Sequence, residues 1–131
     1  MERLLYISTA RQVLDPQELN DILRRARRSN AALDVTGLLA VGGRRFLQLL
    51  EGPAEGVAQI YDRIRQDPRH FAIVKLSHKV VDSRQTAGWA MAYHEPHSGK
   101  LLQDIVAELI SEIKDPTLGA EFAHFARRHA A

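Results

Sequence analysis

The sequence contains no cysteine. Disulfide bonds, thiolate nucleophiles and zinc or iron–sulfur sites with cysteine ligands are therefore excluded. Long hydrophobic runs are missing as well, since no segment approaches the roughly 20 apolar residues that cross a membrane. The first residues, MERLLYISTAR, lack the apolar core of a signal peptide. We therefore expect a cytoplasmic protein with no membrane segment.

Neither sign of charge dominates the chain. The 18 Lys and Arg residues against 16 Asp and Glu residues give a net charge of +2, which is too weak a field to indicate nucleic acid as a partner. The six histidines show no ligand spacing, so we expect no metal. No P-loop, GxGxxG motif or nucleophile–base–acid set is visible. The length and the 45% hydrophobic content fit one globular core.

Alternating apolar runs and turn residues predict an α+β, ferredoxin-like fold. Strands are expected at 3–8, 35–41, 45–51, 71–84 and 88–94, with a first helix from Asp15-Pro16 to about Ser29–Asn30 and a second from Pro53 to Asp67-Pro68. The resulting order is β-α-β-β-α-β plus one strand. Such a sheet carries both helices on one face.

The C-terminal part has a different pattern. An amphipathic helix is expected over 100–116 and a short helix over 120–131, with Pro116 and Gly119 as interruptions. We expect a domain over 1–96 and a helical extension over 97–131. Because two helices leave the other face of the sheet bare, the extension is expected to pack there. The alternative is that it forms a dimer or partner surface.

Gln48 lies inside the apolar stretch FLQLLEG. An amide buried there without a partner costs about 1–3 kcal/mol. In the ferredoxin-like order the first and third strands are neighbours, so the Tyr6 phenol can meet the Gln48 amide and form a hydrogen bond. Alternatively, Gln48 would face water if its strand were an edge. However, Leu47 and Leu49 on the other face, and Phe46 and Leu50 on the face of Gln48, indicate burial on both faces.

Three further polar residues are expected around the gap between the two helices. Asn30 ends the first helix, and Arg69 and His70 follow the second. Amide and guanidinium groups suit the carbonyl and N–H edge of a flavin or a purine, and spacing alone does not choose between them. Simpler roles are a helix C-terminal residue for Asn30 and a solvated turn for the other two. The RRARR segment at 24–28 reads as a solvated face, although one arginine could meet a diphosphate.

Five segments make the sequence recognisable: LLYIS, ARRSNAALDVTGLL, FLQLLEGP, IRQDPRH and WAMAY. In this order and spacing they resemble the BLUF domain, a blue-light sensor that uses FAD. The resemblance covers about residues 3–94 and leaves out the helical extension.

The resemblance implies a role for each matching position. Tyr6 matches the tyrosine that donates an electron, and then a proton, to the excited flavin. Gln48 matches the glutamine between that tyrosine and the N5 and C4 carbonyl of the flavin, and Asn30 matches the asparagine that fixes the pyrimidine edge. Arg69 and His70 match residues near the pyrimidine ring and the ribityl chain.

Trp89 and Met91 match the strand-five pair whose arrangement is thought to follow the state of the glutamine; taken alone, both would be core residues. The sequence departs from the family pattern at two positions. Thr86 stands where the family often has phenylalanine, three residues before the tryptophan. Ser29 stands where some members have histidine. Both departures bear on flavin affinity or on how the strand-five signal is transmitted.

The resemblance therefore implies a photoreceptor that binds FAD without a covalent bond. The missing cysteine fits this expectation, because a flavin–cysteine adduct cannot form. We expect no enzymatic activity, an unidentified downstream protein partner and a homo-oligomer. Two other classes stay open: a small flavin-dependent or acylphosphatase-like enzyme, and a binding module that does not respond to light.

Overall fold

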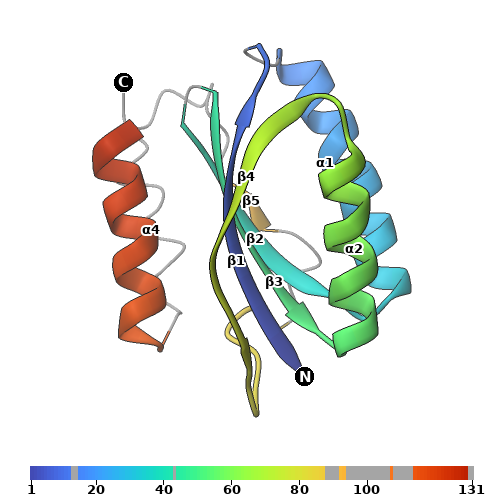
Figure 1. Cartoon of the computed structure of the whole chain (residues 1–131), viewed down its shortest axis with the longest axis vertical. Coiled ribbons are helices and arrows are strands. Elements are labelled where there is room, and N and C mark those ends of the chain that lie inside the picture. The colour runs from blue at the N-terminus through green and yellow to red at the C-terminus, as the bar shows by residue number, and fades with distance from the viewer. Residues whose placement is uncertain (13–14, 43, 88–91, 94–106, 108–113, 130–131) are drawn as a thin grey trace.

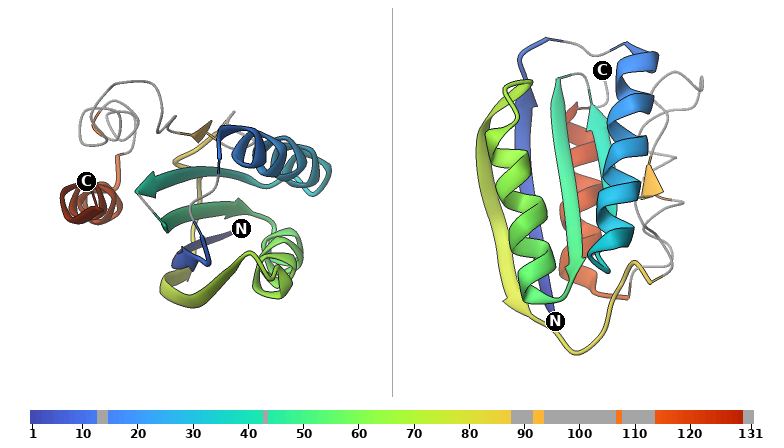
Figure 2. Two further views of the ribbon diagram at one scale, coloured as in Figure 1. Left: turned by 90° about the horizontal axis from the view of Figure 1, so that it is seen from above. Right: turned by 90° about the vertical axis from the view of Figure 1, so that its right-hand side faces the viewer.

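The computed structural model describes residues 1–12, 15–42, 44–87, 92–93, 107 and 114–129. Its elements are β1 (Glu2–Ala10), α1 (Pro16–Ala32), β2 (Thr36–Gly42), β3 (Arg45–Gly52), α2 (Ala54–Gln66), β4 (His70–Val80), β5 (Ala92–Tyr93) and α4 (Pro116–His129). The sheet lies between α4 on one side and the pair α1 and α2 on the other (Figure 1, Figure 2). The predicted α+β fold is confirmed.

The five strands are ordered β4-β1-β3-β2-β5. The pairs β1–β3, β1–β4 and β2–β3 are antiparallel, and β5 runs parallel to β2. The first and third strands are therefore central neighbours, as the ferredoxin-like order requires. Because β3 lies between β1 and β2, the alternative that places Gln48 on an edge strand is wrong.

Local signals explain most of the element boundaries. Asp15 caps α1, since its carboxylate accepts a 2.8 Å hydrogen bond from the Glu18 amide. The helix continues to Ala32, past the predicted end at Asn30, and the chain then turns at Asp34, whose φ of 57° is left-handed. The strand predicted over 71–84 ends at Val80. Of the strand predicted over 88–94, the structure describes only Ala92 and Tyr93.

Among the described residues, the face of the sheet toward α1 and α2 carries the larger apolar cluster. Its members are buried side chains from β1, β2, β3 and both helices, among them Leu4, Leu23, Leu39, Leu50 and Ile60. Gly56 lets α2 approach the end of α1, because a Cβ there would lie 2.7 Å from the Leu33 carbonyl oxygen. Close packing therefore holds α2 in place.

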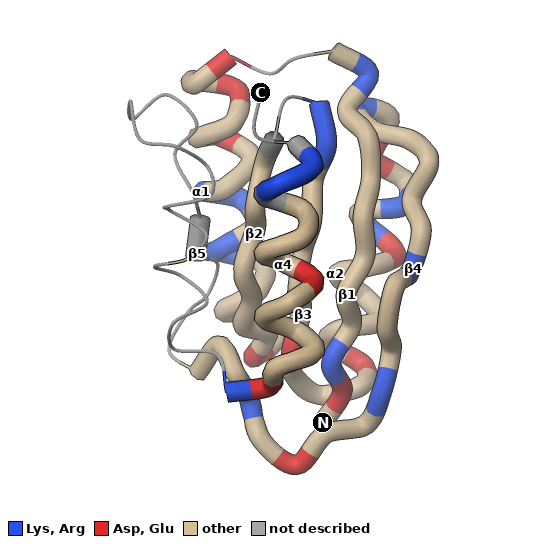
Figure 3. The backbone as a smooth tube through the Cα atoms, turned by 90° about the vertical axis from the view of Figure 1, so that its left-hand side faces the viewer, with Lys and Arg blue, Asp and Glu red and all other residues tan. Residues whose placement is uncertain are grey.

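The opposite face packs against α4. Phe122 and Phe125 of α4 lie against Leu38 and Leu49 of the central strands, and α4 crosses β2 and β3 in Figure 3. This supports the expected packing of the extension for the helix that is described, whereas 100–113 falls almost wholly outside the described residues. The expected interruption at Gly119 is wrong, because α4 starts at Pro116 and includes it. No helix among the described residues is both long enough and apolar enough to cross a membrane.

Candidate functional site

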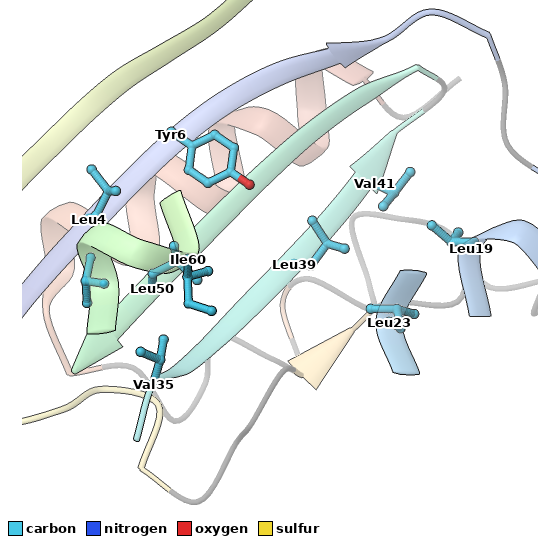
Figure 4. Close-up of a cluster of buried hydrophobic side chains, with 10 residues drawn as sticks. Leu4, Tyr6, Leu19, Leu23, Val35, Leu39, Val41, Leu50 and Ile60 are labelled. Carbon is cyan, nitrogen blue, oxygen red and sulfur yellow. The ribbon is translucent and has the colours of Figure 1, made fainter. Parts of the chain in front are cut away.

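Tyr6 and Gln48 are directly opposite each other on β1 and β3. Their exposed fractions are only 2% and 8%, and the Tyr6 hydroxyl donates a hydrogen bond to Gln48 Oε1. The ring of Tyr6 lies among the apolar side chains between the sheet and the helices (Figure 4). The predicted partnership is confirmed, and it explains how this amide is accommodated in an apolar strand.

A cavity of about 300 Å³ opens beside this pair, between the sheet, α1 and α2. This volume is at the lower end of the range for small-molecule sites. Most of its lining is apolar, from Leu19, Ile22, Leu23, Leu39, Phe46, Ile60 and Ile64. All five of the predicted cofactor-contacting or photochemical residues that the structure describes line it: Tyr6, Asn30, Gln48, Arg69 and His70.

Asn30 is located in the last turn of α1 and is 1% exposed. Its backbone carbonyl accepts from the Val35 amide at 2.8 Å, which ties the end of the helix to the start of β2. The left-handed residue after α1 is Asp34, so the simple role of Asn30 as a left-handed terminator is wrong. A buried amide that lines a cavity can present both a donor and an acceptor to a ligand.

Arg69, which lines the cavity, is held by Asp67. Arg69 Nη2 lies 2.5 Å from Asp67 Oδ2, and Arg69 Nε lies 2.9 Å from Oδ1. These hydrogen bonds lower the pKa of the Asp67 carboxyl and raise the pKa of the Arg69 guanidinium. The cation is therefore oriented before any ligand arrives.

His70 is half-buried and bridges two elements. Its Nε2 lies 2.5 Å from the Ile64 carbonyl oxygen, and its Nδ1 lies 3.0 Å from Ser8 Oγ. Because a carbonyl oxygen only accepts, Nε2 carries a proton; in the neutral ring Nδ1 accepts from the Ser8 hydroxyl. His70 thus joins the end of α2 to β1, which is a more structured role than a solvated turn.

Burial raises the pKa of the Tyr6 phenol far above its ordinary value, with further contributions from Tyr61 and Asp67. The resting phenol therefore keeps its proton. The Tyr61 ring is the aromatic neighbour of Tyr6, at 5.5 Å between centroids and an angle of 64°. The Lys75 ammonium lies 5.0 Å from the Tyr61 centroid.

Sequence reasoning missed three polar residues that line the cavity, namely Ser8, Arg63 and Asp67, and only hinted at a fourth. Arg63 and Asp67 line the cavity, but no pattern in the sequence distinguishes either of them as a residue that faces it. Arg25 also lines it, so one arginine of the segment 24–28 does face the site. Arg24, by contrast, forms an exposed pair with Asp21 at 3.6 Å. Arg25 and Ser29 are four positions apart and therefore share one face of α1, which is the sequence signal that places Arg25 toward the cavity.

The cavity suits a flat, partly polar molecule. Apolar side chains line its walls, the Tyr6–Gln48 pair and the Asn30 amide provide hydrogen-bonding edges, and three exposed arginines also line it. This donor set fits the ring edge of a flavin and the anionic groups of its side chain. No group of three or more His, Asp or Glu that could hold a metal occurs among the described residues. Trp89 and Met91 lie outside the described residues.

A family model described as sensors of blue-light using FAD matches residues 1–92. Among curated proteins, the chain is 45% identical over 73 residues to the blue light- and temperature-regulated antirepressor BluF of Escherichia coli, which covers 56% of this chain and 18% of that protein. It is 38% identical over 89 residues to a photoactivated adenylate cyclase subunit beta of Euglena longa, covering 67% of this chain and 10% of that protein. The chain thus spans less than a fifth of either relative.

Solved structures agree on the fold. BlrP1 of Klebsiella pneumoniae, in a manganese and cyclic diGMP complex, has a TM-score of 0.83 at 25% identity and covers 96% of this chain and 32% of its own. The BLUF protein BlrB in its dark state has a TM-score of 0.73 at 23% identity, and the match covers 96% and 93% of the two chains. The second comparison shows that a similar fold exists at nearly the same length.

Proposed function

Since the chain belongs to the BLUF family of sensors of blue light using FAD, we propose that residues 1–96 bind FAD non-covalently between α1 and α2 and report blue light through Tyr6 and Gln48. The observation that carries the proposal is the hydrogen bond from the Tyr6 hydroxyl to Gln48 Oε1 at the wall of the apolar cavity. A neutral donor–acceptor pair beside a ligand cavity is an arrangement that can change with the state of that ligand.

Different groups of lining residues would contact different parts of the flavin. Asn30 and Gln48 would hold the polar edge of the ring system, and the leucine and isoleucine side chains would cover its faces. Arg69, His70 and the arginines at 25 and 63 would contact the ribityl chain and the phosphates. When bound, the flavin would supply absorption of blue light and an acceptor for one electron next to Tyr6. The choice of FAD over FMN is part of the proposal.

Tyr6 is suited to give up an electron and then a proton. Burial opposes the phenolate, so the proton stays until the ring loses an electron, and an oxidised phenol is strongly acidic. Its hydroxyl already donates to Gln48, and the proton therefore has a defined first acceptor. Phenylalanine at this position would lack both the oxidisable phenol and the proton.

Gln48 is suited to record the event. Its amide carries a donor and an acceptor on one rotatable group, and a rotation or tautomerisation exchanges the two. The exchange would change the hydrogen bond that Gln48 offers to the cavity and leave its backbone in place between β1 and β2. Trp89 and Met91 remain our predicted partners for this rearrangement.

Absorption spectra before and after blue light test the proposal. Protein purified in the dark with FAD is expected to show a reversible red shift of the flavin bands. Tyr6→Phe and Gln48→Leu are each expected to abolish the shift while flavin remains bound. A wild-type protein that binds FAD without any shift would contradict light sensing and favour the light-independent binding module.

We propose that the output is a change in protein contacts and that the domain itself is not an enzyme. Relatives include an antirepressor and subunits of photoactivated adenylate cyclases, in which the matching part is a small share of the whole. A downstream protein partner and assembly of this chain into a homo-oligomer are the corresponding proposals here. Light-dependent elution on size exclusion, alone and with candidate partners, tests both.

A further inference from the structure

A buried carboxylate organises the opposite face of the sheet. Glu51 of β3 is fully buried and accepts from Arg3 Nε at 2.8 Å, from the Gln85 and Thr86 amides at 2.8 Å each, and from the Thr86 hydroxyl at 2.7 Å. These four donors match the roughly four acceptor sites of a carboxylate. Because a buried carboxylate that loses a hydrogen-bond donor is strongly destabilised, Glu51 holds the groups that donate to it in place.

Three of the four donors come from the segment that leads to the predicted signalling residues. Gln85 and Thr86 immediately precede the residues that include Trp89 and Met91. Thr86 is completely buried, and its hydroxyl also lies 2.9 Å from the Thr36 hydroxyl of β2. The segment is therefore held against the ends of β2 and β3.

The same cluster reaches the first turn of α4. Arg3 Nη1 donates to Asp115 Oδ2 at 3.0 Å, and Asp115 Oδ1 caps α4 by accepting from the Thr117 amide at 3.0 Å. Gln85 Oε1 accepts from the Lys114 amide at 2.6 Å and from the Asp115 amide at 3.2 Å. Gln85 is thus bonded to Glu51 through its backbone and to the start of α4 through its side chain.

We propose that Glu51 is a positioning residue that couples the segment 83–87 to the start of α4. Movement of the chain after Thr86 is then passed to the helix through Gln85 and Arg3. The inference rests on the proposed light response for the source of that movement. It assigns Thr86, which departs from the family pattern, the task of attaching the segment to Glu51.

The test is hydrogen–deuterium exchange of residues 114–119 in the full chain, in the dark and under blue light. Gln85→Ala removes the acceptor of the Lys114 and Asp115 amides but keeps the backbone donor to Glu51. Thr86→Val removes the hydroxyl. Lys79→Ala is the matched control, because Lys79 is an exposed partner of Asp115 at 3.6 Å.

We expect Gln85→Ala to speed exchange at 114–119 in the dark, with or without FAD. We also expect Gln85→Ala and Thr86→Val to lower the light-induced change there to less than half of its wild-type size, with the flavin red shift retained. Lys79→Ala should change neither. An undiminished light-induced change in both variants, or a wild type with a normal red shift and no change at 114–119, would overturn the coupling alone. A wild type with no red shift would overturn the light-sensing proposal as well.

Discussion

The two faces of the sheet use β1 and β3 in different ways. Toward α1 and α2, these strands present the neutral Tyr6–Gln48 pair beside a cavity. Toward α4, they present the charged Arg3–Glu51 pair, which is buried and fully bonded. A neutral pair next to open space can rearrange at modest cost, whereas a buried ion pair cannot lose a partner cheaply. The comparison shows one pair of strands holding an adaptable site and a fixed one.

The largest expected effect on stability comes from removing the cation of the buried ion pair on the α4 side of the sheet. Arg3→Met leaves the Glu51 carboxylate buried without its cation and is expected to lower the free energy of unfolding by about 3–5 kcal/mol. Urea unfolding measures it. The control is Lys79→Met, whose exposed pair with Asp115 spans 3.6 Å and should be worth no more than about 1 kcal/mol. Equal, small losses in both variants would show that the faces do not differ as described.

A second substitution tests the packing of the cavity face. Gly56→Ala places a Cβ 2.7 Å from the Leu33 carbonyl oxygen and is expected to destabilise the fold by about 1–3 kcal/mol. Gly119→Ala in α4 is the matched control, since nothing lies within 4 Å of its Cβ. That change should stabilise the helix by up to about 1 kcal/mol. Thermal unfolding of both variants checks the two signs.

Alkaline pH should weaken the cavity face through Tyr6. The pKa of its phenol is raised in the folded state, so above about pH 10 the unfolded chain loses a proton that the folded chain retains. Stability should therefore fall as pH rises, by up to about 1.4 kcal/mol per pH unit from this group. Urea unfolding between pH 9 and 11 should show a shallower decline for Tyr6→Phe than for the wild type. An identical decline would mean that Tyr6 titrates normally.

The smallest expected effect measures the neutral pair itself. Tyr6→Phe and Gln48→Leu, singly and together, form a double-mutant cycle whose coupling energy is expected to be about 0.5–1.5 kcal/mol. This is well below the effect expected for Arg3 on the other face. A coupling energy of about 3 kcal/mol or more would remove the energetic distinction between the faces.

The sequence allowed the cavity face to be predicted but not the charged one. Adjacent first and third strands follow from topology, and side chains alternate along a strand, so Tyr6 and Gln48 could be placed together. Glu51 stands at the end of a strand, and its neighbours in the sequence do not indicate that its carboxylate is buried and paired. Its donors Gln85 and Thr86 are 34 and 35 residues away, in a segment with no periodic pattern to indicate where it packs.

The start of α4 was predicted incorrectly, although the sequence contains the signal for it. Asp15-Pro16 was recognised as an N-cap followed by a first-turn proline. Asp115-Pro116 is the same pair, and Asp115 caps α4 in the same manner. The expectation that Pro116 and Gly119 interrupt the helix is wrong, because proline is favourable in a first turn and an isolated glycine is tolerated in a helix.

Gln48 and Glu51 are three positions apart along β3, and because side chains alternate along a strand this odd offset places them on opposite faces. An insertion or deletion of one residue between them would exchange inside for outside, sending the carboxylate toward the cavity or the amide toward α4. A substitution changes one side chain on its own face, whereas a change in the length of β3 between the two residues moves one of them to the wrong face of the sheet. The spacing between these two residues along β3 is therefore as important as their identities.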